Sequence, residues 1–230
     1  CSLRVLGTLM KAIVFGANGY LGTSIVDELT KNGFDVTTTS RSSSETEFQT
    51  KNGFNDIISS GKKFNACIWA QGQNAQDTLS SAKNFEAVFE ANVVYTIKSL
   101  TALIENGLLA PQARLVVLSS VWQSLSRTNK FSYSVSKSAV EGLVNSFIAD
   151  YSAQGYSMNA VLPGVVDAPM TRANLSEDQV KKIENETPSQ HLVSASNVAK
   201  VVSWLSSPES AGVNGQFIRV DNGWSHIRAI

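Results

Sequence analysis

The chain has 230 residues, and its 19 lysines and arginines balance its 19 aspartates and glutamates. Because no long run of one sign breaks this balance, the sequence lacks the electrostatic footprint of a nucleic-acid or anionic-lipid binder, and the expected partners are small molecules or copies of itself. Its two cysteines are too few for a disulfide scaffold, which favours a reducing, cytoplasmic setting.

No stretch of the sequence approaches the roughly twenty apolar residues of a membrane span. Residues 1–9 have neither a proper apolar stretch nor a small-residue cleavage site, so we expect no export and no membrane partner. The first strand follows Met10 at once, whereas residues 1–9 show no periodicity. We therefore expect an N-terminal extension over 1–9 and a single domain over 10–230, a size that nucleotide-binding α/β sheets reach as one unit.

Short apolar strands alternate with helices along the chain. In chain order, strands are expected at 11–16, 34–40, 65–70, 114–119, 157–162 and 216–220, and helices at 21–33, near 47–53, and at 81–106, 131–154 and 196–206. This βαβ rhythm predicts a Rossmann-type, doubly wound parallel sheet in three layers, α/β/α. The polar segment 168–194 is expected to form a mobile flap over a site.

Glycines punctuate the turn between the first strand and the first helix, GANGYLG. Such a turn lets the backbone come close to a pyrophosphate, and the helix N-terminus adds N–H donors and a partial positive charge. A purely structural turn explains some glycine triplets, but the strand before it and the helix after it favour a dinucleotide site. The expected contact residues are Gly16, Asn18, Gly19, Tyr20, Leu21 and Gly22.

The end of the second strand indicates which dinucleotide is bound. An acidic residue there would bind the adenosine ribose hydroxyls and repel a 2′-phosphate, but this chain has Ser40 and Arg41 at that place. A guanidinium with neighbouring hydroxyls can hold a phosphate dianion, so NADP(H) is favoured over NAD(H). The alternative is that Arg41 is only a solvated turn residue.

Tyr133 and Lys137 lie four residues apart on a predicted helix, which puts phenol and ammonium on one face. A phenol with a pKa of about 10 is a poor proton shuttle at neutral pH. We expect the ammonium, together with the positive nicotinamide of an oxidised cofactor, to lower the pKa of Tyr133. Ser120 closes a strand at the carboxyl edge, where its hydroxyl would contact the same carbonyl oxygen. Taken alone, such a Tyr–Lys pair is most often exposed helix surface.

The combination resembles the short-chain dehydrogenase/reductase family over nearly all of 10–225. The resemblance rests on the glycine turn, on Ser120 thirteen residues before Tyr133, on Lys137 four residues after it, and on Pro163-Gly164; the segments 214–216 and 220–223 look like that family's closing strand and turn.

By this resemblance Ser120 orients the substrate, Tyr133 is the acid/base, and Lys137 both tunes Tyr133 and binds the nicotinamide ribose. Asn92 matches the position that holds a water in the family's proton relay, with an ordinary polar helix residue as the alternative. The backbone contacts implied for the cofactor come from Ala70, Gln71 and Gly72 at the adenosine ribose and from Pro163, Gly164 and Val166 beside the nicotinamide. The family also implies a homodimer or homotetramer. The apolar positions Val140, Leu143, Val144 and Phe147 suit such an interface, although packing on the chain's own sheet explains part of them.

Three features depart from the family pattern. The spacing of Gly16, Gly19 and Gly22 is more like that of the larger, sugar-nucleotide-modifying branch. The segment 69–72 reads Trp-Ala-Gln-Gly where the family usually has Asn-Asn-Ala-Gly, so the hydrogen bonds of those asparagines must be replaced. Ala168 stands where many members have a threonine that binds the carboxamide.

Trp122 and Gln123, together with the flap, are expected to line the substrate pocket. His191 is a lone histidine without a metal-ligand partner, so no metal site is expected. The leading hypothesis is an NADP(H)-dependent enzyme that interconverts a ketone and a secondary alcohol, for example a 3-oxoacyl thioester reductase. A nucleotide-sugar epimerase or dehydratase is suggested only by the glycine spacing. A sensor or scaffold that binds NADP(H) without turnover is the third hypothesis, and the intact Ser120, Tyr133 and Lys137 argue against it.

Overall fold

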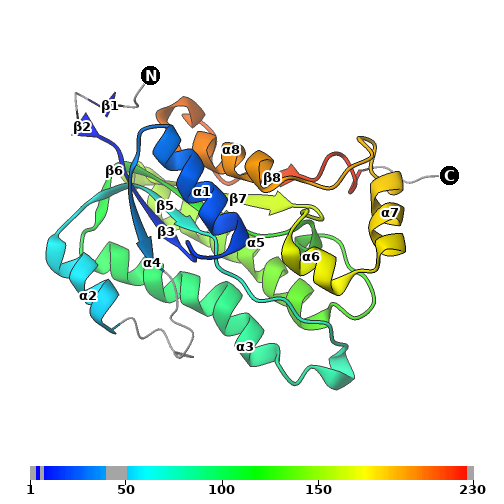
Figure 1. The fold of residues 1–230 in the computed structure, drawn as a ribbon. Helices are drawn as coiled ribbons and strands as arrows, with labels where there is room; N and C mark the ends of the chain where they lie inside the picture. The colour runs from blue at the N-terminus through cyan, green and yellow to red at the C-terminus, as the bar shows by residue number, and fades with distance from the viewer. Residues whose placement is uncertain (1–3, 6–7, 40–50, 227–230) are drawn as a thin grey trace.

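Six parallel strands form the central sheet of the computed structural model, which describes residues 4–5, 8–39 and 51–226 (Figure 1). In sheet order they are β4 (Asp35–Thr39), β3 (Lys11–Phe15), β5 (Phe64–Trp69), β6 (Leu109–Leu118), β7 (Ser157–Pro163) and β8 (Phe217–Val220). All five neighbouring pairs are parallel. The predicted doubly wound parallel sheet is therefore confirmed.

Helices cover both faces of this sheet. α1 (Tyr20–Lys31) and α8 (Ala195–Ser206) lie on one face, whereas α2 (Lys51–Ser60), α4 (Tyr95–Glu105) and α5 (Phe131–Tyr151) lie on the other (Figure 1). Three shorter helices complete the fold: α3 (Phe85–Phe89), α6 (Pro169–Asn174) and α7 (Glu177–Glu186). This is the predicted three-layer α/β/α arrangement.

Alternating strand side chains feed two separate cores, one on each face. In β3, Ala12 and Val14 pack toward α1 and α8, whereas Ile13 and Phe15 pack toward α4 and α5. All four side chains are fully buried. A strand buried on both faces needs a continuous apolar run, which is why the KAIVF segment contains no polar residue after Lys11.

The strand order reverses at β3. The chain passes from β3 outward to β4 and then returns across β3 to pair β5 on its other side. The connections that leave β3 and β5 therefore cross opposite faces of the sheet, and sheets of this kind bind ligands in a crevice at the carboxyl ends of the strands, beside such a reversal.

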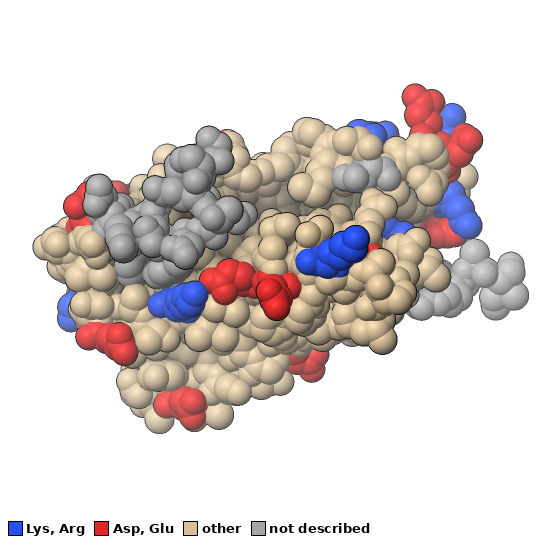
Figure 2. All heavy atoms as spheres, turned by 90° about the horizontal axis from the view of Figure 1, so that it is seen from below, with Lys and Arg blue, Asp and Glu red and all other residues tan. Residues whose placement is uncertain are grey.

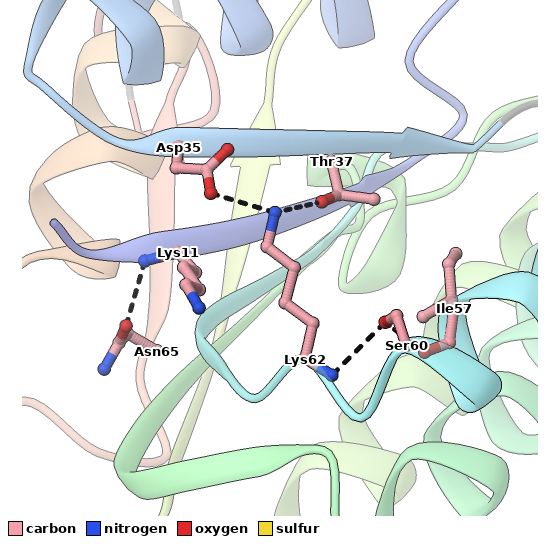
Figure 3. Close-up of polar contacts among 7 residues, drawn as sticks. All are labelled: Lys11, Asp35, Thr37, Ile57, Ser60, Lys62 and Asn65. Atoms are coloured by element: carbon pink, nitrogen blue, oxygen red, sulfur yellow. Dashed lines mark hydrogen bonds and ion pairs between the residues drawn. The ribbon is translucent and has the colours of Figure 1, made fainter.

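A polar cluster fastens the opposite, amino edge of the sheet (Figure 3). The Lys62 ammonium lies 2.9 Å from the Asp35 carboxylate and donates to the Thr37 hydroxyl at 2.9 Å, while the Lys11 backbone N–H donates to the Asn65 side chain. An ion pair this exposed adds little stability. It does show that the one acidic residue of β4 lies at the end remote from Thr39, where the strand meets the crevice.

Several boundary predictions are corrected. The helix expected near 47–53 is α2, Lys51–Ser60, because Ile57 and Ile58 pack against the core and extend the helix toward β5. Within the expected N-terminal extension over 1–9, where no strand was predicted, β1 (Arg4–Val5) and β2 (Thr8–Leu9) form a short antiparallel pair. The strand expected over 114–119 begins earlier, as β6, through a bulge opposite Phe64.

The segment predicted as a mobile flap contains α6 and α7. A β-bridge between Val166 and Val193 joins the end of this segment to the residues that follow β7. The expectation that no stretch approaches the length of a membrane span is wrong, because the helical run 85–105 is long and apolar enough to cross a membrane by length and composition. Leu100 and Leu103 from this run pack into the core beside β5 and β6, which accounts for its apolar character.

Candidate active site

The glycine turn after β3 is built so that only glycine fits at two of its positions. Gly16 has φ +77°, and a Cβ there would lie 2.5 Å from the Gln71 backbone nitrogen. A Cβ on Gly22 would lie 2.1 Å from the Gly16 carbonyl oxygen. The turn is also held to β4, because the Gly16 N–H donates to the Thr39 carbonyl at 2.8 Å. The turn is thereby locked against both neighbouring loops.

The turn leads directly into α1, whose N-cap is Gly19. Within the part of the chain that the structure describes, no side chain caps this helix end, so its first N–H groups suit an anionic ligand. Asn18, Gly19 and Tyr20 are exposed around this end, whereas Leu21 packs into the core below. The structure therefore brings the predicted dinucleotide residues together, while Ser40 and Arg41 lie outside the described residues.

We expect a Gly16→Ala variant to lose about 2 to 5 kcal/mol of unfolding free energy, because the methyl group adds a backbone clash to the strain of a positive φ. A denaturant titration measures this. Gly61→Ala is the matched control, since Gly61 also has a positive φ, +60°, but its Cβ would meet nothing within 4 Å. The control should lose only about 1 to 2 kcal/mol. Equal losses in the two variants would contradict the close approach to Gln71.

The second loop of the crevice follows β5 and compensates for the missing asparagines. The Trp69 indole stacks on Phe15, with ring centroids 5.3 Å apart, and donates to the Ser99 hydroxyl at 2.7 Å. The Gln71 amide donates to the Thr96 hydroxyl at 2.9 Å. These two bonds tie the loop to α4 in place of the family's asparagine contacts.

The Gln71 side chain also carries an unused acceptor. Its Oε1 is buried and has no hydrogen-bond partner among the described residues. A buried oxygen of this kind is costly unless a ligand or water satisfies it. Gln71 Oε1 could accept a hydrogen bond from a ribose hydroxyl of a dinucleotide whose pyrophosphate lies at the glycine turn. Ala70 is held against β3, because its N–H donates to the Phe15 carbonyl at 2.9 Å.

Asn92 lies in a π-helical turn, Glu90–Val94, between α3 and α4. Its side chain is buried, accepts from the Gln73 N–H at 2.7 Å, and donates to the Ser136 hydroxyl at 2.8 Å. A Cβ on Gly72 would be 3.2 Å from Asn92 Oδ1 and 3.6 Å from Lys137 Nζ. Asn92, Gly72 and Lys137 therefore meet at one point, and π turns are frequent at functional sites.

Ser120, Tyr133 and Lys137 also converge. Ser120 follows β6 and is 5% exposed, and its hydroxyl lies close enough to the Tyr133 phenol to lower the pKa of that phenol. Its Oγ accepts from the Trp122 N–H at 3.3 Å, which leaves the hydroxyl proton to be donated. The Lys137 ammonium lies 5.7 Å from the centroid of the Tyr133 ring and donates to the Leu118 carbonyl at 2.8 Å.

The electrostatics of this group differ from expectation. Burial raises the pKa of the Tyr133 phenol, and the hydrogen bond with Ser120 offsets this only in part. Burial also lowers the pKa of Lys137 to about 8. The protein alone therefore keeps Tyr133 protonated rather than lowering its pKa, because desolvation of the phenolate dominates. A protonated phenol is the form that donates to a carbonyl oxygen.

The start of the catalytic helix is fixed by a residue that the sequence did not reveal. Asp77, from the loop after β5, is buried and accepts from the Ser132 N–H at 2.9 Å and from the Ser132 hydroxyl. Its backbone carbonyl accepts from the Phe131 N–H at 3.1 Å. The cofactor loop and the catalytic helix are therefore joined across 55 residues of sequence, a contact that no local pattern indicates.

The segment after β7 passes along the same edge. The Gly164 N–H donates to the Val220 carbonyl, and a Cβ on Gly164 would lie 2.7 Å from that of Asp221, so glycine is needed there. Pro163 pairs with Val220. The bridge to Val193 uses the Val165 carbonyl and the Asp167 N–H. Because the segment is extended, the Val166 N–H points away from Val193. This direction leaves it available for the predicted contact with the carboxamide.

The two predicted substrate residues are placed differently. The Trp122 ring lies 5.6 Å from that of Trp224, edge to face, and the Arg127 guanidinium lies 5.8 Å from it. Gln123 is 7% exposed, and its amide donates to Glu141 on α5 at 3.3 Å. The Gln123 side chain therefore packs against the helix, because the turn after Ser120 directs it inward, and its role in substrate contact stays a prediction.

These residues can hold a dinucleotide and protonate an oxygen. The glycine turn and the uncapped start of α1 suit a pyrophosphate, and Tyr133, with Ser120 and Lys137 beside it, supplies the proton donor. No group of three or more His, Cys, Asp or Glu that could hold a metal occurs within 4–5, 8–39 and 51–226.

A family model described as enoyl-(acyl carrier protein) reductase matches residues 44–225. A 3-oxoacyl-(acyl-carrier-protein) reductase from Buchnera aphidicola is 27% identical over 234 residues, covering 92% of this chain and 96% of that protein. The structure of an aldohexose dehydrogenase from Thermoplasma acidophilum has a TM-score of 0.86 at 22% identity, over 96% of each chain. A gluconate 5-dehydrogenase from Burkholderia cenocepacia, in complex with NADP and tartrate, has a TM-score of 0.85 at 17% identity, over 95% of this chain and 96% of that one. Since the family model spans most of its length, the chain belongs to the short-chain dehydrogenase/reductase family.

Proposed function

We propose that this oxidoreductase uses NADP(H) to interconvert a ketone and a secondary alcohol. The observation that carries the proposal is the convergence of the Ser120 hydroxyl, the Tyr133 phenol and the Lys137 ammonium at the carboxyl edge of the sheet. The Lys137 ammonium in turn lies beside Gly72, on the loop that follows β5.

Tyr133, Ser120 and Lys137 each have a separate role in the proposed reduction. A nicotinamide cofactor, when bound, supplies the hydride. Tyr133 gives its proton to the carbonyl oxygen, because burial keeps the phenol protonated at neutral pH. Ser120 donates its hydroxyl proton to the same oxygen, since Trp122 already occupies an acceptor position on Oγ. Lys137 has two further N–H donors beside its bond to Leu118, and its ammonium lies next to Gly72, where these donors can bind a ribose hydroxyl.

The preference for NADP(H) rests on the carboxyl end of β4. Its last residue, Thr39, contacts the glycine turn, and the only carboxylate of the strand, Asp35, pairs with Lys62 at the far end. No carboxylate of β4 is then near a 2′-phosphate, and Ser40 and Arg41 follow directly. The similar gluconate 5-dehydrogenase was solved with NADP.

We expect an Arg41→Ser variant to bind NADPH about tenfold or more weakly and NADH with little change, because a guanidinium pairs with a 2′-phosphate, which NADH lacks. Fluorescence titration of the wild type and the variant with both nucleotides measures this. Arg172→Ser is the matched control, since Arg172 is an exposed arginine on α6 paired with Asp167. An equal loss of NADH affinity in Arg41→Ser would contradict the assignment.

A 3-oxoacyl thioester is our first candidate substrate, supported by the Buchnera aphidicola relative. The description of the matching family model names an enoyl thioester instead. The Tyr133 phenol stands where it would protonate an oxygen, which suits a ketone better than a carbon–carbon double bond.

We also propose a homodimer or homotetramer formed through the outer faces of α4 and α5. Three residues of the predicted interface are buried in the chain's own core and cannot contact a second copy: Val140, Val144 and Phe147. Ile97 on α4 and Val135 on α5 are exposed instead. On this side of the molecule both signs of charge are interspersed among uncharged side chains, without one single-sign patch (Figure 2).

The decisive assay follows the absorbance of the reduced nicotinamide with a simple ketone, a 3-oxoacyl thioester and an enoyl thioester. NADPH oxidation with the ketone or the oxoacyl compound supports the proposal. Oxidation with the enoyl compound alone would replace it by double-bond reduction. Tight NADPH binding without any turnover would instead favour a sensor.

A further inference from the structure

A second buried lysine flanks the catalytic tyrosine. Lys130 immediately precedes α5 and is only 6% exposed. Its Nζ lies 5.0 Å from the centroid of the Tyr133 ring, closer than that of Lys137. Lys137 has a place in the proposed chemistry, whereas Lys130 so far has none. Burying a second ammonium here is costly, so it calls for a function.

The groups around Lys130 do not fully neutralise the charge of its ammonium. Its Nζ donates to the amide oxygen of Asn74, which is neutral. Asp77, the carboxylate that acts on it, already accepts two hydrogen bonds from Ser132 at the start of the helix. Burial and repulsion by Arg127 lower the pKa of Lys130 to about 8, and Asp77 opposes this only in part.

The surrounding wall is also cationic. The segment 119–130 contains no aspartate or glutamate, and its Arg127 lies over the Trp122 ring. From β8, Arg219 donates to the hydroxyl of Ser124, which lies in this segment, at 2.9 Å. An anion bound between this turn and Tyr133 would therefore be attracted by several cations.

We propose that Lys130 binds a carboxylate of the substrate, so that the carbonyl group held at Tyr133 belongs to a short oxo acid. This inference rests on the proposed function, because Tyr133 fixes where the carbonyl lies. The exposed Asn74 side chain turns its oxygen to Lys130 and so presents its NH₂ group as a second donor. One ammonium and one amide match a monoanion better than a phosphate dianion. Because Lys130 Nζ lies only 5.0 Å from the centroid of the Tyr133 ring, the carboxylate and the carbonyl would belong to one short molecule.

The first experiment compares 3-oxobutanoate with its neutral methyl ester at saturating NADPH. The wild type should show a kcat/KM at least about tenfold higher for the acid. Lys130→Met should abolish this preference and Lys130→Arg should keep it, while the exposed control Lys200→Met on α8 should leave it unchanged. Because each ratio compares two substrates on one protein, a general loss of folded enzyme cancels.

The second experiment measures binding without turnover. Calorimetry of butanoate and its neutral analogue butanamide, with NADPH present, should show tighter binding of the anion to the wild type and equal binding to Lys130→Met. If butanoate binds more tightly than butanamide but no ketone is reduced, the result supports the carboxylate site and contradicts the proposed reduction. Turnover of the ester without a preference for the acid would keep the reduction and overturn the carboxylate site. Neither turnover nor a binding difference would overturn both.

Discussion

A Tyr133→Phe variant is expected to lose about 10² to 10⁴-fold in kcat/KM for ketone reduction while its fold and NADPH affinity are kept. The phenol is the group placed to give a proton to the substrate oxygen, and burial keeps it protonated at neutral pH. The remaining phenyl ring still fills the space between Lys130 and Lys137. Steady-state rates, nucleotide titration and thermal unfolding of the variant separate these effects.

Tyr151→Phe provides the matched control on the same helix. Tyr151 lies at the other end of α5 and stacks on Phe147 with ring centroids 5.0 Å apart, far from the crevice. Its hydroxyl is not part of the proposed chemistry, so the control should keep wild-type rates. If Tyr133→Phe retained more than about a tenth of the wild-type rate, another group would have to supply the proton.

A Lys137→Met variant is expected to lose about 100-fold or more in kcat/KM for NADPH, because both its ribose contact and its charge beside Tyr133 disappear. The pH dependence gives a second readout. Burial lowers the pKa of Lys137 to about 8, so its ammonium is charged below that pH and neutral above it. In the wild type, kcat/KM for NADPH should therefore fall as the pH rises through about 8, and this limb should be missing in Lys137→Met.

Lys130 has a similarly lowered pKa of about 8, so it must be separated from Lys137 in this experiment. Lys130→Arg carries a permanent charge over the whole pH range and serves for this purpose. The limb near pH 8 should persist in Lys130→Arg. Its loss there would transfer the titration to Lys130 and contradict the role assigned to Lys137.

The fold could be predicted because its signals are local. The apolar strand before Gly16 and the amphipathic helix after it indicated the βαβ unit, and the spacing of Tyr133 and Lys137 placed both on one helix face. The structure agrees at these points, with Gly16 at a positive φ and the Lys137 ammonium 5.7 Å from the centroid of the Tyr133 ring. Polar boundaries such as that of α2 were less certain, because packing of Ile57 and Ile58 decides where the helix lies.

The hydrogen bonds that hold the site residues in place could not be predicted, because they join segments that are distant in the sequence. Asp77 holds the start of α5 from 55 residues away, and Lys130 reaches Asn74 across 56. The bond between Trp69 and Ser99 replaces an asparagine contact, and neither residue type signals this alone. Burial raises the pKa of the Tyr133 phenol in the protein alone, and this burial cannot be seen in a sequence; the predicted lowering, which includes the charge of an oxidised cofactor, stays a prediction.

The most direct test of the central claim is to follow the hydride itself. The protein is incubated with a ketone and NADPH deuterated at either C4 position, and the product alcohol is analysed by mass spectrometry. We expect deuterium on the carbinol carbon from one of the two labelled forms only, at a rate that falls in Tyr133→Phe. NADPH oxidation that leaves the alcohol unlabelled by both forms, or no alcohol at all across the panel of ketones and oxoacyl thioesters, would contradict the proposed ketone reduction.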